Sequence, residues 1–234
     1  MENYLTQFPL QYPVQKRVKK PKGKNAVEIK FEQMTKDVDY ARKYKITSYI
    51  LLFFIFASIG WCWEVSLHLI KDGVLVNRGV LMGPWLPIYG SGGVMILVLL
   101  RKWVNKPVLT FFLVMFLCTG VEYVTSWWLE YTKGMKWWDY SGYFLNINGR
   151  VCLLGAVTFA IGGTAFIYFI APRIDNLLLK LSKKMTICLC CILVCLFAAD
   201  WLHSQKHPNT GDGVTGGSFV TLPMVVHELM DRGK

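Results

Sequence analysis

Two carboxylates lie inside apolar stretches of the chain, where a charge is expensive. Glu64 stands late in the stretch at 46–69, with His68 one helical turn beyond it, and Glu122 stands in the stretch at 108–131. A charged side chain at the centre of a membrane costs about 3 kcal/mol even on lenient scales, so such groups usually face a bundle interior or a water-filled cavity. A carboxylate there can bind a polar or cationic solute, or act as an acid or base. We expect Glu64 and Glu122 to line a polar cavity, and His68 either to pair with Glu64 or to handle protons.

More polar side chains occur near the ends of such stretches. Ser126 and Glu130 follow Glu122 at intervals of four residues, so the three share one helix face. Glu122 and Glu130 stand about 12 Å apart along the helix axis, too far to form one carboxylate pair. Arg150 and Asp200 stand at the ends of other apolar stretches. These groups either lie at the wet membrane interface, with Arg150 paired to an acid, or join the cavity.

Proline and glycine interrupt one apolar stretch. The sequence GVLMGPWLPIYGSGG (79–93) contains five glycines and two prolines. Pro84 and Pro87 lack a backbone amide, whereas Gly83 and Gly90 permit irregular dihedral angles or close approach. Irregular backbone at membrane depth persists only where protein or a wet cavity satisfies it, and broken helices build substrate sites in transporters. The pattern fits equally well a loop that leads into a short, tightly packed helix.

Helices must position these residues. Several apolar stretches approach the roughly 20 residues that a helix needs to cross a bilayer. They predict an all-α membrane protein with about five transmembrane helices, of which the second is irregular. The expected spans are 46–69, 80–100, 108–131, 151–171 and 185–201.

Lysine and arginine predict the orientation. With the N-terminus inside, the inner segments carry 11, 3 and 4 of these residues, and the outer segments carry 2, 3 and 3. Cytoplasmic segments carry the excess, so we expect the N-terminus inside and the C-terminus outside. The polar segments 71–79, 137–150 and 203–213 then share the outer face. On the inner face, Ile174, Leu177, Leu178 and Leu181 at helical spacing beneath lysines in 174–184 predict a short helix lying on the membrane surface.

The net charge of +11 is concentrated in the first segment. Residues 1–45 hold 11 of the 26 lysines and arginines, including QKRVKKPKGK at 15–24. Such a segment is typical of a cytoplasmic tail that contacts anionic lipids or simply orients the first helix, and we expect no nucleic-acid partner. We expect a basic, disordered tail at 1–45, a multispan domain at 46–213 and a C-terminal tail at 214–234, in a multi-pass protein of the cell membrane.

Several kinds of chemistry lack their motifs. The sequence has no GxxxxGK[ST] phosphate loop, so it cannot hydrolyse ATP in that way, and it has no HExxH. The seven cysteines lie in or beside apolar stretches, unlike a disulfide framework. The four between 188 and 195 have no histidine among them. We expect no cofactor and no metal, and the sequence identifies no catalytic residue.

The motifs together resemble a known family. GWCWE (60–64), NRGVLMGPWLPIYGSG (77–92), VEYVTSWWLE (121–130), WWDYSGYFLNINGRVCLLG (137–155) and HPNTGDG (207–213) are similar, in this order, to the CmpB-type family of ABC-transporter type IV membrane proteins. The resemblance covers about residues 46–213. It implies a permease, whose ATPase would be a separate subunit on the inner face. The matching positions are Gly60, Trp61, Glu64, Asn77, Arg78, Gly79, Gly83, Pro84, Pro87, Tyr89, Gly90, Glu122, Tyr123, Glu130, Trp138, Asp139, Tyr140, Asn148, Gly149 and Arg150.

Three functions remain open. The first is a transporter permease subunit with a polar cavity in the outer half of the bundle. The second is a membrane-embedded enzyme that acts on a lipid or envelope intermediate, and the third is a non-catalytic membrane assembly protein. Expected partners are membrane lipids, while an ATPase subunit and a homo-oligomer stay open. The candidate cavity residues are Glu64, His68, Asn77, Arg78, Glu122, Glu130, Asp139, Asn148 and Arg150, and the candidate broken-helix backbone is Gly83, Pro84, Pro87 and Gly90.

Overall fold

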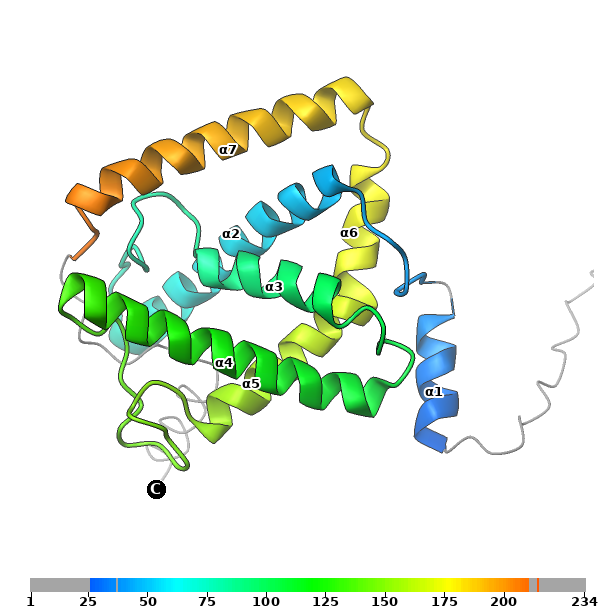
Figure 1. Ribbon diagram of the computed structural model, residues 1–234, viewed down its shortest axis with the longest axis horizontal. Helices are drawn as coiled ribbons and strands as arrows, with labels where there is room; N and C mark the ends of the chain where they lie inside the picture. Colours follow the sequence, from blue (N-terminus) through cyan, green and yellow to red (C-terminus); the bar gives the residue numbers. More distant parts are fainter. Residues whose placement is uncertain (1–25, 37, 211–213, 215–234) are drawn as a thin grey trace, which may run out of the picture. The chain divides into compact units, whose positions relative to one another are not determined.

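The computed structural model describes residues 26–36, 38–210 and 214 (Figure 1). The chain divides into two units, Met1–Lys36 and Asp37–Lys234. In the first unit, α1 spans Ala26–Thr35, so part of the tail that was expected to be disordered is helical. Residues 1–25 lie outside the described part. The described residues form no sheet, and the one isolated bridge pairs Ile147 with Val151.

The second unit is built from apolar helices. They are α2 (Ile46–Asp72), α3 (Pro87–Leu99), α4 (Pro107–Lys133), α5 (Leu153–Ala165), the π-helix η1 (Phe166–Ile170), α6 (Ala171–Leu178) and α7 (Lys183–Lys206). α5, η1 and α6 join into one helix from Leu153 to Leu178. This helix, α2, α4 and α7 are each long and apolar enough to cross a membrane, and α3 is a shorter apolar helix.

Many large apolar side chains on these helices face outwards. Phe116, Ile161 and Ile192 are each more than half exposed. Such surfaces are costly in water over this extent, whereas lipid tails cover them without penalty. The four long helices therefore confirm a multi-pass membrane protein.

Local sequence sets the helix ends. Gly73 and Gly134 follow α2 and α4 with φ of 71° and 72°, in the left-handed region that glycine adopts without steric cost. Pro87 and Pro107 lie in the first turns of α3 and α4, where the missing amide costs no helical hydrogen bond.

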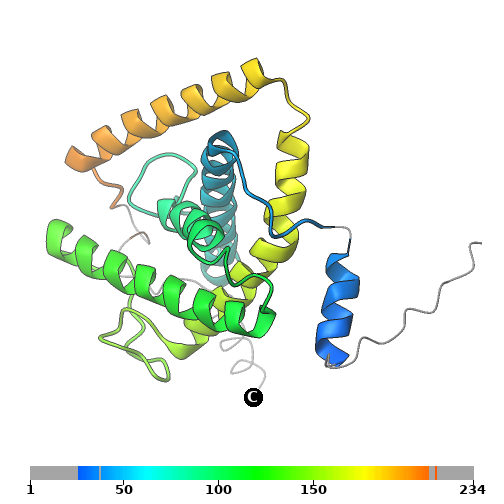
Figure 2. The same cartoon turned by 45° about the vertical axis from the view of Figure 1, so that its right-hand side comes forward.

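The second predicted span is irregular, and its helical part is α3 alone. Residues 79–84 form bends before the helix begins at Pro87. Figures 1 and 2 show α3 between α2 and α4. Its approach to α2 depends on Gly90, because a Cβ atom there would lie 2.5 Å from the Phe53 carbonyl oxygen.

The fourth span continues further than the sequence suggests. Residues 174–178 extend this helix instead of starting a separate helix on the membrane surface. Pro172 lies in the first turn of α6, directly after the π-helical turn, and a wider turn accommodates a proline that cannot donate to the preceding turn. Asp175 is buried and pairs with Arg42 at 3.2 Å. This ion pair holds 174–178 against the segment that precedes α2, and these residues do not form the separate helix that the sequence predicts.

Three connecting segments meet at one end of the helices, called the loop end below. They are 73–86, 134–152 and the described residues after α7, 207–210 and Val214. Asn209 donates its side-chain amide to the carbonyl oxygens of Asn77 (2.8 Å) and Gly79 (3.1 Å). Val76, Trp137, Trp138, Tyr140, Cys152 and Val214 form a buried apolar cluster there. These segments therefore lie at the same end of the helices, as the predicted number of spans requires.

Candidate functional site

Glu64 is fully buried on α2, although it is an acid in an apolar helix. Its Oε1 accepts a hydrogen bond of 2.6 Å from the Tyr89 hydroxyl, which α3 supplies. Gly60 allows this contact, because a Cβ atom there would overlap the Tyr89 ring. The Oε2 atom is also buried, and no hydrogen-bond donor among the described residues reaches it.

Glu122 on α4 repeats this arrangement with a different tyrosine. It is 1% exposed, and its Oε1 accepts a hydrogen bond of 3.0 Å from the Tyr140 hydroxyl. Its Oε2 is buried and lacks a donor within the described part of the chain. Tyr140 belongs to the loop at 134–152 and is itself fully buried, and burial raises its pKa well above the ordinary value. The hydroxyl therefore stays protonated and acts as a donor to Glu122.

The two glutamates and their tyrosines are electrostatically coupled. We call Glu64, Tyr89, Glu122 and Tyr140 the carboxylate cluster. Glu64 acts on Glu122 as a like charge, and the guanidinium of Arg78 acts on Glu64 as an opposite charge. Arg78 is 3% exposed and donates to the Val214 carbonyl oxygen at 3.2 Å. Unpaired buried charge is costly, so a cation or a proton at the free oxygen atoms would stabilise the cluster.

Two clefts reach the carboxylate cluster. The first has a volume of about 550 Å³, contains Glu64 and Arg78, and is lined by Trp128, Trp138 and Trp201. The second has a volume of about 450 Å³, contains Glu122 and Tyr89, and is otherwise lined mainly by apolar side chains and glycines of α2 to α5. Ile88 lines both clefts, so they adjoin on either side of the first turn of α3.

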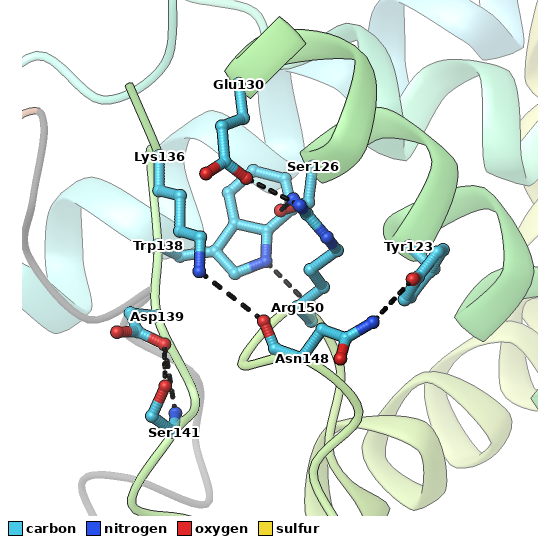
Figure 3. A network of polar contacts seen from close by, with 9 residues as sticks. All are labelled: Tyr123, Ser126, Glu130, Lys136, Trp138, Asp139, Ser141, Asn148 and Arg150. Atoms are coloured by element: carbon cyan, nitrogen blue, oxygen red, sulfur yellow. Dashed lines mark hydrogen bonds and ion pairs between the residues drawn. The ribbon is translucent and has the colours of Figure 1, made fainter. Parts of the chain in front are cut away.

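A separate set of polar contacts covers the loop end (Figure 3). We call it the rim network. Arg150 forms an ion pair of 2.6 Å with Glu130 and a hydrogen bond of 3.4 Å with the Ser126 hydroxyl. Its guanidinium also stands 5.8 Å from the ring centroid of Tyr123. The face of α4 that carries Glu122 thus continues into the rim through Ser126 and Glu130.

Exposed residues of the 134–152 loop complete the rim network. Asn148 has a φ of 54° and donates to the Tyr123 hydroxyl at 2.9 Å. Asp139 accepts hydrogen bonds from the Ser141 hydroxyl (2.6 Å) and the Ser141 amide (3.0 Å). These bonds, the hydroxyl first, hold the pKa of Asp139 below its ordinary value. Asp139 is therefore bonded within the loop, whereas Asn148 fastens the loop to α4.

The structure divides the nine candidate cavity residues into groups. Glu64, Arg78 and Glu122 line the clefts. Glu130, Asp139, Asn148 and Arg150 belong to the rim network and line neither cleft. His68 is buried one turn beyond Glu64. Asn77 accepts from the Trp61 indole at 2.6 Å and donates to the Met82 carbonyl at 2.9 Å, so it fastens the 73–86 segment to α2.

The candidate broken-helix backbone has a protein partner. Asp200 on α7 accepts from the amides of Met82 (3.0 Å) and Gly83 (2.9 Å) and from the Trp85 indole (2.7 Å). Gly83 has no room for a side chain, since a Cβ atom would lie 2.9 Å from the Asp200 carboxylate. Pro87 is the first residue of α3 and also lines the first cleft. Pro84 is exposed.

Sequence reasoning on polar residues missed two members of the carboxylate cluster. Tyr89 and Tyr140 matched the family motifs but were not candidate cavity residues. A signal existed for Tyr89, since it lies only two residues after Pro87 in a glycine-rich helix start. Nothing in the spacing of Tyr140 indicates that it reaches Glu122.

The fold and the site define a multi-pass α-helical membrane protein with two buried, coupled carboxylates beside apolar clefts. Residues 51–205, well over half of the chain, match the model of the family described as "Putative ABC-transporter type IV". The chain belongs to this family. Searches of curated proteins and of solved structures gave no match.

Proposed function

We propose that the protein is a permease subunit of a cell-membrane transporter and binds a cationic solute at the carboxylate cluster. One observation carries this proposal. Glu64 and Glu122 are buried, each lines a cleft, and each keeps one oxygen atom without a donor among the described residues. A bound cation would supply the missing donors and balance the like charges. Family membership supports the transport class.

The proposed topology has five spans, with the N-terminus inside. α3 and the bends before it form the second span together, and Asp200 satisfies the backbone of those bends. The excess of lysine and arginine on the segments before α2, after α3 and around 179–184 favours this orientation. In this orientation, the outer half of the membrane contains the loop end, the polar residues of both clefts and the rim network.

The proposal requires an energy source outside this chain. The sequence has no phosphate loop for ATP, so an ATP-hydrolysing partner would bind the inner segments. Membrane lipids would surround the helices, and a second copy of the chain remains compatible with the exposed face of α7.

The test combines partner identification with a matched pair of variants. The tagged full-length protein is purified in native-lipid particles, and all co-purifying proteins are identified by mass spectrometry. We expect a stoichiometric ATPase subunit, and uptake of at least one compound from a panel of organic cations. Glu122→Gln should abolish that uptake, while Asp139→Asn, in the rim network, should retain it. A complex without an ATPase, or normal uptake in Glu122→Gln, would contradict the proposal.

A further inference from the structure

The second cleft is elongated and changes in polarity along its length. On α2 it extends from Trp63 back to Phe56, about 10 Å along the helix axis, and on the fourth span it extends from Thr158 to Ile170, about 18 Å. The polar residues Glu122 and Tyr89 stand at its end nearer the loop end. The opposite end is formed by apolar side chains, among them Phe56, Ile96, Phe166 and Ile170.

The second cleft also opens towards the surroundings of the helices. Ile59 on α2 and Ile161 on α5 line it, and their exposed fractions are 49% and 60%. Both residues lie within the spanning segments. A molecule dissolved in the hydrocarbon can therefore enter between these helices without crossing the polar rim.

Glu122 specifies the group that fits the polar end. Its Oε2 can accept a hydrogen bond, and no donor among the described residues reaches it. Glu64 adds a like charge nearby, while the positive charge of Arg78 acts on Glu64. A single ammonium group donates to this Oε2 and balances the negative charge of Glu122.

We infer that the solute is an amphiphile drawn from the bilayer, with one ammonium group that binds Glu122 and one alkyl chain that occupies the second cleft. This inference rests on the proposed function and names its substrate class. A volume of about 450 Å³ lies within the range of roughly 300–1,000 Å³ that is usual for small-molecule sites. On the proposed topology, the ammonium group points outwards and the chain inwards, as in a lipid of the outer leaflet.

Two glycines offer a matched pair of variants. Gly162 lines the second cleft, and a Cβ atom at this position would meet no atom within 4 Å. Gly120 on α4 has the same free space and lines neither cleft. Gly162→Leu should therefore fill the cleft without a clash at Cβ, and Gly120→Leu is its control for a leucine introduced into a spanning helix.

The experiment uses the full-length protein in phosphatidylcholine nanodiscs and three probes. Dodecylamine carries the head and the chain, butylamine the head with a short chain, and dodecanol the chain without a charge. Binding is measured by competition against dodecylamine with a diazirine at the end of its chain, whose crosslinks are mapped by mass spectrometry. We expect crosslinks in 163–170, since that segment lines the apolar end of the cleft.

The variants separate the two parts of the ligand. Gly162→Leu should weaken dodecylamine binding at least tenfold and leave butylamine binding unchanged, whereas Gly120→Leu should change neither. Glu122→Gln should weaken both amines at least tenfold and change dodecanol little. If Gly162→Leu leaves dodecylamine binding intact, the alkyl chain is not in the second cleft, although the cation site stands. If the wild type binds neither amine, the cation site and the proposed function fail together.

Dilution distinguishes a ligand from the bilayer from one taken up from water. At a constant ratio of dodecylamine to lipid, a tenfold dilution of the sample should leave occupancy unchanged when the probe enters from the membrane. An occupancy that falls with dilution would overturn the bilayer as the source.

Discussion

The carboxylate cluster and the rim network use the same residue types but satisfy them differently. In the rim, Arg150 neutralises Glu130, Ser141 binds Asp139, and Tyr123 accepts from Asn148. Figure 3 shows these contacts at the loop end, gathered separately around Arg150, Asn148 and Asp139. The buried cluster supplies each glutamate with one tyrosine only, and the second oxygen of each stays free of donors among the described residues.

This difference distinguishes polar groups that are bonded within the protein from polar groups that a ligand would complete. An acid near water that is already paired or hydrogen-bonded adds modest stability and needs no ligand. A buried acid with a free oxygen atom costs stability unless it is protonated or something binds it. The helices retain two such groups beside clefts, which supports the proposed role in binding. The following four substitutions test this contrast.

The largest effect is expected from a pair of acid-to-amide changes. Asp200→Asn places an amide where two carboxylate oxygens accept from Met82, Gly83 and Trp85, so at least one donor faces another donor. Hydrogen bonds to charged groups are worth about 1.5–3 kcal/mol each, and the thermal midpoint of unfolding should fall clearly. Glu64→Gln removes a buried charge and should leave the midpoint nearly unchanged or raise it.

Thermal unfolding of both variants in the same lipid particles checks this pair. Equal losses in Glu64→Gln and Asp200→Asn would erase the distinction between the two kinds of acid. That outcome would favour an assembly protein, in which the buried glutamates hold the bundle together.

A smaller effect is expected when the donor to Glu122 is removed. Tyr140→Phe leaves Oε1 of Glu122 without its donor, which costs about 1–3 kcal/mol. The loss should also depend on pH. Burial raises the pKa of Tyr140 above the unfolded value of about 10, so its contribution is complete below that pH and declines as pH rises towards the folded pKa.

The stability of Tyr140→Phe should therefore differ most from the wild type below about pH 10. Thermal midpoints between pH 7 and pH 11 measure this difference. A difference that grows at alkaline pH would contradict the burial of the hydroxyl.

The smallest effect is expected in the rim. Asp139→Asn retains a side chain that can accept from Ser141, and Asp139 is exposed, so the free energy of unfolding should change by less than about 0.5 kcal/mol at neutral pH. The pKa of Asp139 is lowered by folding, so its small contribution is present above the unfolded pKa and disappears as pH falls through the folded pKa. A midpoint measured from pH 7 down to pH 3 should therefore converge for the wild type and the variant.

The elements were largely predictable, and the partners within the site were not. Every predicted span contains a helix, because length and apolarity of a segment are local properties of the chain. The same reasoning failed at 174–178, where Asp175 finds Arg42 from a distant segment. It also grouped Asp139 and Asn148 with Glu64, whereas Asp139 bonds to Ser141 within the loop and Asn148 bonds to Tyr123 on α4.

The sequence by itself determined a membrane protein with helices at these positions, an interrupted second span, and two acids within the apolar segments. Each follows from the free-energy cost of exposing polar groups to hydrocarbon, because that cost depends on each residue locally. Only the tertiary structure decided that Tyr89 and Tyr140 donate to those acids, that Asp200 supports the irregular backbone, and that two clefts adjoin at Ile88. Those features depend on which helix faces approach one another, and packing between distant segments sets them.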